Sequence, residues 1–70
     1  MTISEIIKKR LTDLEMTQTE LASALGTTRQ NLSNKISRDN FTAKELSQIA
    51  EILKLEIILK DSEFKYILKY

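Results

Sequence analysis

The residues between positions 28 and 35 carry guanidinium, ammonium, amide and hydroxyl groups but no carboxylate. The guanidinium of Arg29 is a planar fork that matches O6 and N7 of guanine, and the amide of Gln30 or Asn34 can pair with N7 and N6 of adenine. The methyl group of Thr28 can contact thymine. These residue types predict a segment that reads base edges in a DNA groove, and the base-reading candidates are Thr28, Arg29, Gln30, Asn31 and Asn34.

The formal net charge is only +1, which is low for a nucleic-acid-binding protein, but the charges are unevenly distributed. From Arg29 to Arg38 there are three basic residues and no acidic one, whereas positions 11–25 hold three acidic residues and no basic one. This segregation is typical of a molecule with one DNA-facing side, and scattered solvated charges are the alternative interpretation. A DNA-binding protein with so small a net charge should show modest nonspecific affinity and a shallow salt dependence.

The composition argues against catalysis and against a bound metal. With no His and no Cys, the chain lacks the commonest general base, the commonest zinc ligands and any disulfide. Its single Gly excludes a glycine-rich phosphate loop. Asp13, Glu15 and Glu20 are acidic, but we expect them on helix surfaces with no cleft to concentrate them. We therefore expect no enzyme activity, no cofactor, no metal and no small-molecule ligand.

Length and hydropathy place further bounds on the chain. No apolar run approaches the roughly 20 residues of a membrane span, and no basic segment precedes a hydrophobic one at the start. We therefore expect a soluble cytoplasmic protein without membrane contact. The 70 residues make one domain, 1–70, whose small core gives marginal stability. Oligomerisation is the remaining way to add stability, since disulfides and zinc sites are excluded.

Helix starts recur along the chain as capping boxes, Ser/Thr-x-x-Glu/Gln, in which two side chains satisfy backbone N–H groups. The box occurs four times, each time before apolar residues at helical spacing. Gly26 follows the second candidate helix, where a positive φ can end it. The predicted boxes are Thr2–Glu5, Thr17–Glu20, Thr27–Gln30 and Thr42–Glu45, and the helices run from about Ile3 to Leu14, Thr17 to Leu25, Thr28 to Ile36 and Ala43 to Lys54.

The apolar positions of each helix fall on one face, which predicts a shared core. Lys8, Lys9 and Arg10 are expected to form a solvated face, and the polar segment 37–40 is expected to be a loop. Phe41, just before the Thr42 cap, can act as a hydrophobic staple. The predicted inward residues are Ile3, Ile7, Leu11, Leu14, Leu21, Ala22, Leu25, Leu32, Ile36, Leu46, Ile49, Ala50 and Leu53.

The C-terminal tail, residues 55–70, alternates between apolar and polar residues on both sides of a connection at 60–63. Alternation with β-branched and aromatic residues favours a β-hairpin, although the turn lacks the usual Gly. A fifth helix capped by Ser62 is the alternative. A two-stranded hairpin is marginal in water, so it should pack on the helices or pair with a second subunit. Tyr66 and Tyr70 are expected to serve that packing rather than base stacking.

Two short helices joined at Gly26 are typical of a helix-turn-helix, whose second helix enters the major groove. The segment 17–36 supplies the required parts: Ala22 where the helices cross, and Leu21, Leu25 and Leu32 between them. This stretch resembles the pattern Gln-x-x-Leu-Ala-x-x-x-Gly-x-x-x-x-x-Leu of the Cro/repressor (XRE-like) family of phage and bacterial regulators. The resemblance extends over about 3–59.

The resemblance implies a lambda-repressor-like fold of four helices and further contacts to DNA. In the subgroup that positions 29–35 and 38–41 resemble, the fourth helix leads into a strand, which favours the hairpin. By resemblance Gln18 contacts phosphate, and an ordinary solvated role is its alternative. Many members have an aliphatic residue where Lys35 stands, so the third helix is expected to be rotated or extended at its end. The phosphate-binding candidates are Gln18, Ser33, Lys35, Arg38 and Asn40.

These observations predict a sequence-specific double-stranded-DNA-binding regulator. We expect a homodimer, built through the tail with the fourth helix as a further candidate, that places two recognition helices in major grooves roughly 34 Å apart on a near-palindromic operator. Repression by covering a promoter is the default hypothesis. The alternatives are an antitoxin-type protein that also binds a toxin, and a protein-docking module that reuses the fold.

Overall fold

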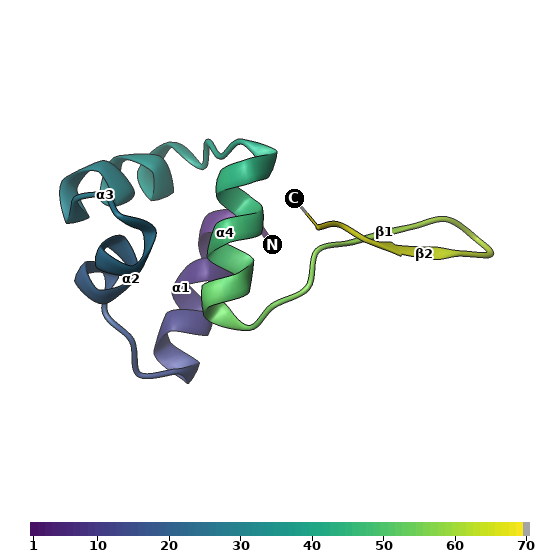
Figure 1. Ribbon diagram of the computed structural model, residues 1–70, viewed down its shortest axis with the longest axis horizontal. Coiled ribbons are helices and arrows are strands. Elements are labelled where there is room, and N and C mark those ends of the chain that lie inside the picture. Colours follow the sequence, from purple (N-terminus) through teal and green to yellow (C-terminus); the bar gives the residue numbers. More distant parts are fainter. Residues whose placement is uncertain (70) are drawn as a thin grey trace.

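The computed structural model describes residues 1–69, and in that range the chain forms four helices followed by one antiparallel hairpin (Figure 1). The predicted mainly α fold with a C-terminal hairpin is confirmed, and the fifth-helix alternative is wrong. Tyr70 lies outside the described residues. The elements are α1 (Ile3–Asp13), α2 (Gln18–Leu25), α3 (Arg29–Arg38), α4 (Ala43–Leu53), β1 (Ile58–Lys60) and β2 (Lys65–Ile67).

Threonine caps begin each of the four helices within residues 1–69, and three of the four predicted capping boxes are present. The prediction for Thr27 with Gln30 is wrong: Thr28 caps α3, and its hydroxyl accepts from the Asn31 N–H at 3.1 Å. Thr27 is already used at the end of α2, where its N–H donates to the Ala22 carbonyl at 2.9 Å. Because the backbone of Thr27 takes part in the C-terminal cap of α2, the N-cap of α3 falls one residue later, at Thr28.

Gly26 makes the turn between α2 and α3 with φ of +74°. A Cβ added to it would meet no atom within 4 Å, so only the left-handed backbone requires glycine. We expect Gly26→Ala to lower the free energy of unfolding by about 1–2 kcal/mol, measured by urea denaturation. Gly26→Asn is the matched control and should lose less, since Asn tolerates this conformation. A larger loss for Gly26→Asn than for Gly26→Ala would mean that side-chain bulk, not backbone strain, decides.

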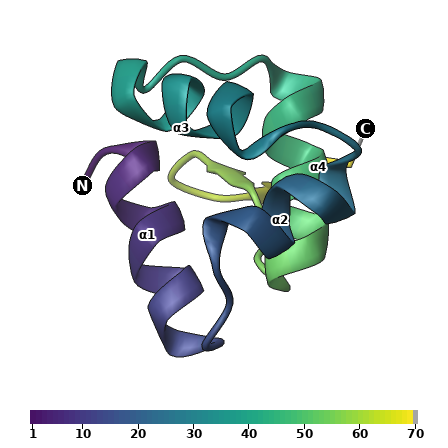
Figure 2. The ribbon, with the colours of Figure 1, turned by 90° about the vertical axis from the view of Figure 1, so that its left-hand side faces the viewer.

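The core lies where the inner faces of the four helices meet (Figure 2). The helical spacing predicted its members correctly, and those at the margin, such as Ile3 and Leu25, are half-buried against it. Phe41 also packs against this cluster, as expected for a staple residue. The buried apolar residues are Ile7, Leu11, Leu21, Ala22, Leu32, Ile36, Ile49, Ala50 and Leu53.

The third helix is longer than predicted, because it continues through Ser37 and Arg38 to a cap at Asp39. Asp39 has a φ of 52°, and its carboxylate accepts from the Ser4 N–H of α1 at 2.8 Å. The Ser4 hydroxyl donates to the Ile36 carbonyl at 2.6 Å. These two bonds join the start of α1 to the end of α3, which explains why the expected loop at 37–40 is helical in its first half.

A second tie between helix ends corrects the expectation for Arg10. Its Nε donates to the Leu53 carbonyl at 2.8 Å, and the side chain is half-buried rather than solvated. A guanidinium at a helix C-terminus satisfies an unpaired carbonyl and favours the helix dipole. Lys8 and Lys9 are exposed as predicted, and Lys9 pairs with Asp13 at 3.2 Å.

The hairpin pairs Ile58 with Ile67 and Lys60 with Lys65, and it extends away from the helices (Figure 1). The hairpin turn contains no glycine and is stabilised instead by the side chain of Asp61. Its Oδ1 accepts from the N–H groups of Phe64 at 2.7 Å and Glu63 at 2.8 Å, and these bonds lower the pKa of the carboxyl. Within residues 1–69, no helix is both long and apolar enough to cross a membrane.

Candidate nucleic-acid interface

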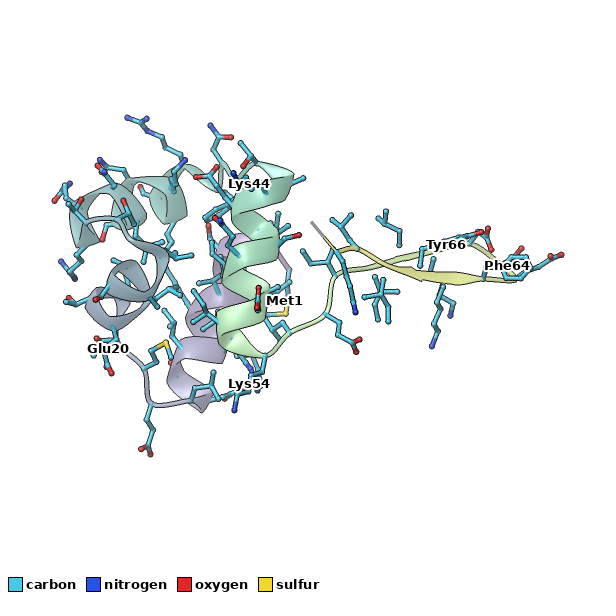
Figure 3. All side chains as sticks on the ribbon, viewed as in Figure 1. Met1, Glu20, Lys44, Lys54, Phe64 and Tyr66 are labelled. Atoms are coloured by element: carbon cyan, nitrogen blue, oxygen red, sulfur yellow. The ribbon has the colours of Figure 1, made fainter. Side chains whose placement is uncertain are left out.

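The outer face of α3 is polar and lies on the side of the molecule away from the hairpin (Figures 1 and 3). Leu32 and Ile36 face the core, and no acidic residue occurs in this helix. All five candidates for base reading are exposed, as are two of the five candidates for phosphate binding. The exposed candidates are Thr28, Arg29, Gln30, Asn31, Asn34, Arg38 and Asn40, while Gln18, Ser33 and Lys35 are half-buried.

A shallow polar hollow of about 260 Å³ lies along this face. It brings predicted base-reading and phosphate-binding residues together, because positions 31, 34 and 38 share one side of α3 and Thr27, just before the helix, accepts from the Asn31 amide at 3.4 Å. Amide, guanidinium and ammonium groups line it, and all three can donate to an anion or a base edge. The lining residues are Thr27, Asn31, Asn34, Lys35, Arg38 and Asn40.

The first turn of α3 holds the side chains with the most recognition capacity. Arg29 has no hydrogen-bond or ion-pair partner among residues 1–69, so its fork is available. The Gln30 Nε2 donates to Asn34 Oδ1 at 3.2 Å, and this bond aligns two amides along the outer face. Thr28 acts as the helix cap, so its hydroxyl is engaged while its methyl group stays exposed.

Gln18 and Ser33 contact each other across α2 and α3. The Ser33 hydroxyl donates to Gln18 Oε1 at 2.9 Å. This bond fixes the Gln18 amide and leaves its NH₂ group to donate elsewhere, beside the N-terminus of α2, where anions are favoured. The structure thus gives Ser33 a positioning contact to Gln18 in addition to the phosphate role expected from the sequence.

Lys35 forms an ion pair with Glu45, in the first turn of α4. The side chain borders a cleft of about 100 Å³ with Leu25, Leu32 and Ile49. This contact explains how a lysine fits at this position: the stem lies beside apolar residues and the ammonium is neutralised. Ile36 is buried, and α3 extends two residues past its predicted end, which agrees with the rotation or extension that the lysine at position 35 led us to expect. Arg29 and Arg38 then supply most of the free positive charge on α3.

The ion pair makes stability depend on pH. The hydrogen bond from Lys35, with one from the Thr42 N–H, lowers the pKa of Glu45 from 4.5 to about 2. A lowered carboxyl pKa stabilises the fold above pH 4.5, and that contribution disappears as the pH falls from 4.5 toward 2. We expect Lys35→Met to be less sensitive to this acidification than the wild type, measured as the shift in urea midpoint between pH 7 and pH 3.

A matched control for this prediction is Lys44→Met, which removes an exposed lysine from the same helix as Glu45. It should keep the acid sensitivity of the wild type. Equal sensitivity of Lys35→Met and the wild type would show that the pair does not control the Glu45 carboxyl.

Sequence reasoning missed one residue on this face. Ser37 was expected in a loop but is helical and exposed, three residues beyond Asn34 and seven beyond Gln30. That spacing was the available signal. Residues 1–69 place no group of three or more His, Cys, Asp or Glu side chains where they could hold a metal ion.

The structure thus defines a small helical domain with a helix-turn-helix pair whose second helix presents a polar, acid-free face. The chain belongs to the family described as Domain of unknown function (DUF6471), whose model matches residues 1–58. The matched segment covers all of α1 to α4 and ends at the first residue of β1. No curated protein and no solved structure matches the chain.

Proposed function

We propose that this protein binds double-stranded DNA sequence-specifically as a homodimeric transcriptional regulator. The observation that carries the proposal is the outer face of α3, which is exposed, polar and free of acidic residues. A face that docks another protein would be expected to carry aromatic or aliphatic anchors instead. The resemblance of 17–32 to the Cro/repressor family supports the same reading.

In the proposed complex α3 lies in the major groove and α2 crosses the DNA backbone. Arg29 and Gln30, at the start of α3, read base edges. Gln18, held by Ser33, donates to a phosphate at the N-terminus of α2. Arg38 and Asn40 line the polar hollow at and beyond the C-terminal end of α3. Their contacts to DNA phosphates fix the register of α3 along the duplex.

The proposed regulator acts by occupancy, since a promoter covered by the dimer is closed to other proteins. Repression is therefore the default mode. An antitoxin-type role is the second candidate, and one observation favours it: the hairpin exposes large apolar side chains that could bind a protein partner. In that case DNA would still contact α3.

Glu45 is expected to restrain DNA binding, because it neutralises Lys35. We expect Glu45→Gln to raise the affinity for duplex DNA and to steepen the salt dependence by up to about one phosphate contact. Fluorescence anisotropy over a series of salt concentrations measures both. The control is Glu51→Gln, an equal charge change at an exposed position of α4. If the two variants gain equally in DNA affinity and salt dependence, the gain comes from the change in net charge and not from the release of Lys35.

The proposal is tested by mapping the contact surface. Isotope-labelled protein is titrated with duplex DNA of random sequence at low salt, and amide resonances are followed by NMR. We expect shifts to cluster on α3 and on the first turn of α2, and to fade as salt is added. Shifts confined to the hairpin or α1, or no shifts at all, would contradict the proposed function.

A further inference from the structure

The hairpin has one face that is apolar over most of its length. Residues directly opposite each other in an antiparallel pair share a face, and side chains alternate along each strand. The register Leu59 to Tyr66 therefore places alternate residues on one side, while the other side mixes the Lys60–Lys65 pair with the Ile58–Ile67 pair. We call the segment 57–68 the arm, and its apolar face consists of Ile57, Leu59, Phe64, Tyr66 and Leu68.

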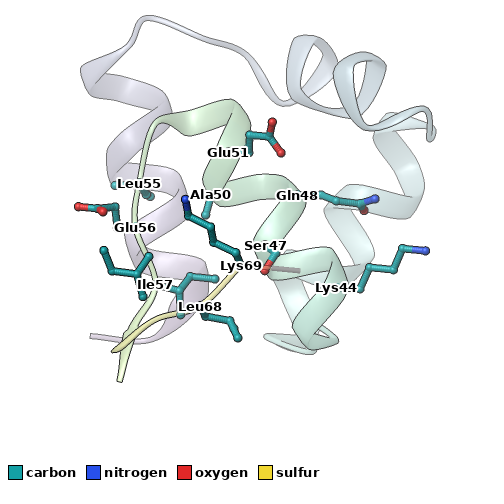
Figure 4. Close-up of a pocket in the computed structure, with 11 residues that line it drawn as sticks. Lys44, Ser47, Gln48, Ala50, Glu51, Leu55, Glu56, Ile57, Leu68 and Lys69 are labelled. Atoms are coloured by element: carbon teal, nitrogen blue, oxygen red, sulfur yellow. The ribbon is translucent and has the colours of Figure 1, made fainter. Parts of the chain in front are cut away.

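The helices cover only the root of this face. Ile57 and Leu68 are half-buried, whereas Leu59, Phe64 and Tyr66 are 61%, 59% and 55% exposed. Figure 3 shows Phe64 and Tyr66 far from the helices, and their rings lie 6.4 Å apart. Even at the root, a groove of about 500 Å³ separates α4 from the arm (Figure 4). An isolated two-stranded hairpin is marginally stable in water, so we expect another surface to pack against this apolar face and cover it.

The arm is built for contact through its face rather than through its edges. Hydrogen bonds from Leu68 N–H to Ile57 and from Asp61 N–H to Phe64 mark the paired positions of the ladder. By alternation, the free backbone groups belong to Ile58, Lys60, Lys65 and Ile67. Lysines at strand edges discourage edge-to-edge pairing, because two copies would bring like charges together.

A second apolar feature lies beside the root of the arm. A cleft of about 200 Å³ is open between α1, α4 and the segment that leads to β1. Ile6, on the outer side of α1, is 41% exposed at this cleft. The other lining residues are Ile3, Ile7, Leu46, Ile49, Ala50, Leu55, Glu56 and Ile57, so the cleft holds one charged residue.

We propose that the cover is the arm of a second copy, packed face to face and antiparallel across a two-fold axis. In this arrangement the tip of each arm, with Phe64, lies over the root and the apolar cleft of its partner. From its root to Phe64 this face is apolar and complementary to itself, as a two-fold contact requires, and the carboxylate of Asp61 lies at its tip, opposite Phe64. This face-to-face packing of two arms would be the interface of the proposed homodimer. Formation of the interface does not depend on DNA binding.

The exposed area fits a small, weak dimer interface. Each half-exposed large side chain leaves about 100 Å² to bury, so Leu59, Phe64, Tyr66 and Ile6 supply roughly 400 Å² per copy, to which the half-buried residues of the arm and the cleft add. A standard stable interface buries about 800 Å² per partner. We therefore expect a dissociation constant of about 10–100 µM. The outer face of α3 stays free, because it lies on the opposite side of the molecule (Figure 1).

Sedimentation equilibrium without DNA tests the interface. The wild type should dimerise, and both Leu59→Ser with Tyr66→Ser and the distant Ile6→Ser should raise the dissociation constant about tenfold or more. The control pair Lys60→Gln with Lys65→Gln, on the other face of the same strands, should leave it nearly unchanged. A wild type that stays monomeric at about fifty times the expected constant overturns the proposal.

Cross-linking gives a test that does not depend on weakened folding. The chain has no cysteine, so a single one can be introduced at Leu59 or at Lys60. Under mild oxidation Leu59→Cys should form a covalent dimer at least tenfold faster than Lys60→Cys. Equal rates would contradict face-to-face packing. A monomer that still binds DNA through α3 refutes the arm interface and the homodimer but leaves DNA recognition by α3 standing, whereas a dimer that binds no DNA refutes the DNA-binding function but leaves the arm interface standing.

Discussion

Replacing Arg29 and Gln30 together with alanine is expected to weaken binding to the preferred DNA site by about 30-fold or more. Each good bidentate contact to a base contributes about 1–3 kcal/mol of discrimination, and every 1.4 kcal/mol is about tenfold in affinity. Both side chains are exposed in the first turn of α3. The loss should therefore appear as reduced preference for that site over random duplex, measured by competition in fluorescence anisotropy.

Arg29→Lys separates base reading from charge. It keeps the positive charge but loses the planar fork, so binding to random duplex should persist while the preference for the selected site falls. Lys60→Ala is the second control, since this exposed residue belongs to the hairpin, which extends away from the helices (Figure 1). If Arg29→Lys retains full preference, Arg29 contacts phosphate and does not read a base.

Leu21→Ala is expected to cause the largest loss of stability, about 2–5 kcal/mol. The Leu21 side chain is fully buried, at 0% exposure, and α2 packs on both α3 and α4. A domain of this size has a free energy of unfolding of roughly 4–10 kcal/mol, so the variant should lose a large share of it. Thermal and urea denaturation measure the effect.

Ser23→Ala in the same helix is the matched control, because Ser23 is exposed. It should change the free energy of unfolding by less than about 0.5 kcal/mol. A Leu21→Ala protein as stable as the control would mean that α2 is not anchored through this side chain, and the position assigned to α3 would then lose its support.

The helices could be predicted from sequence because their signals are local. A threonine cap with a glutamate three residues later and a regular apolar spacing are fixed by neighbours along the chain. The one misplaced cap, at Thr27, shows the limit of this reasoning. Thr27 and Gln30 have the spacing of a capping box, but the N–H of Thr27 is bonded to the Ala22 carbonyl at the end of α2, and Thr28 caps α3 instead.

The contacts that position α3 could not be predicted, since they join residues far apart in sequence. Ser4 binds Asp39 and Arg10 binds Leu53, at separations of 35 and 43 residues. Neither pair leaves a pattern in the chain, and Arg10 was assigned to a solvated face for that reason. The arm is an intermediate case: alternation predicted its strands, but not that its apolar face would stay exposed.

The most direct test of the DNA-binding proposal is selection of duplexes bound by the wild type from a random DNA pool. We expect enrichment of a two-fold symmetric motif, with half-sites separated by about one helical turn or a multiple of it. An asymmetric enriched motif would keep α3 as the reader but contradict the dimer. No enrichment, even at low salt, would contradict the proposal that α3 recognises DNA sequence.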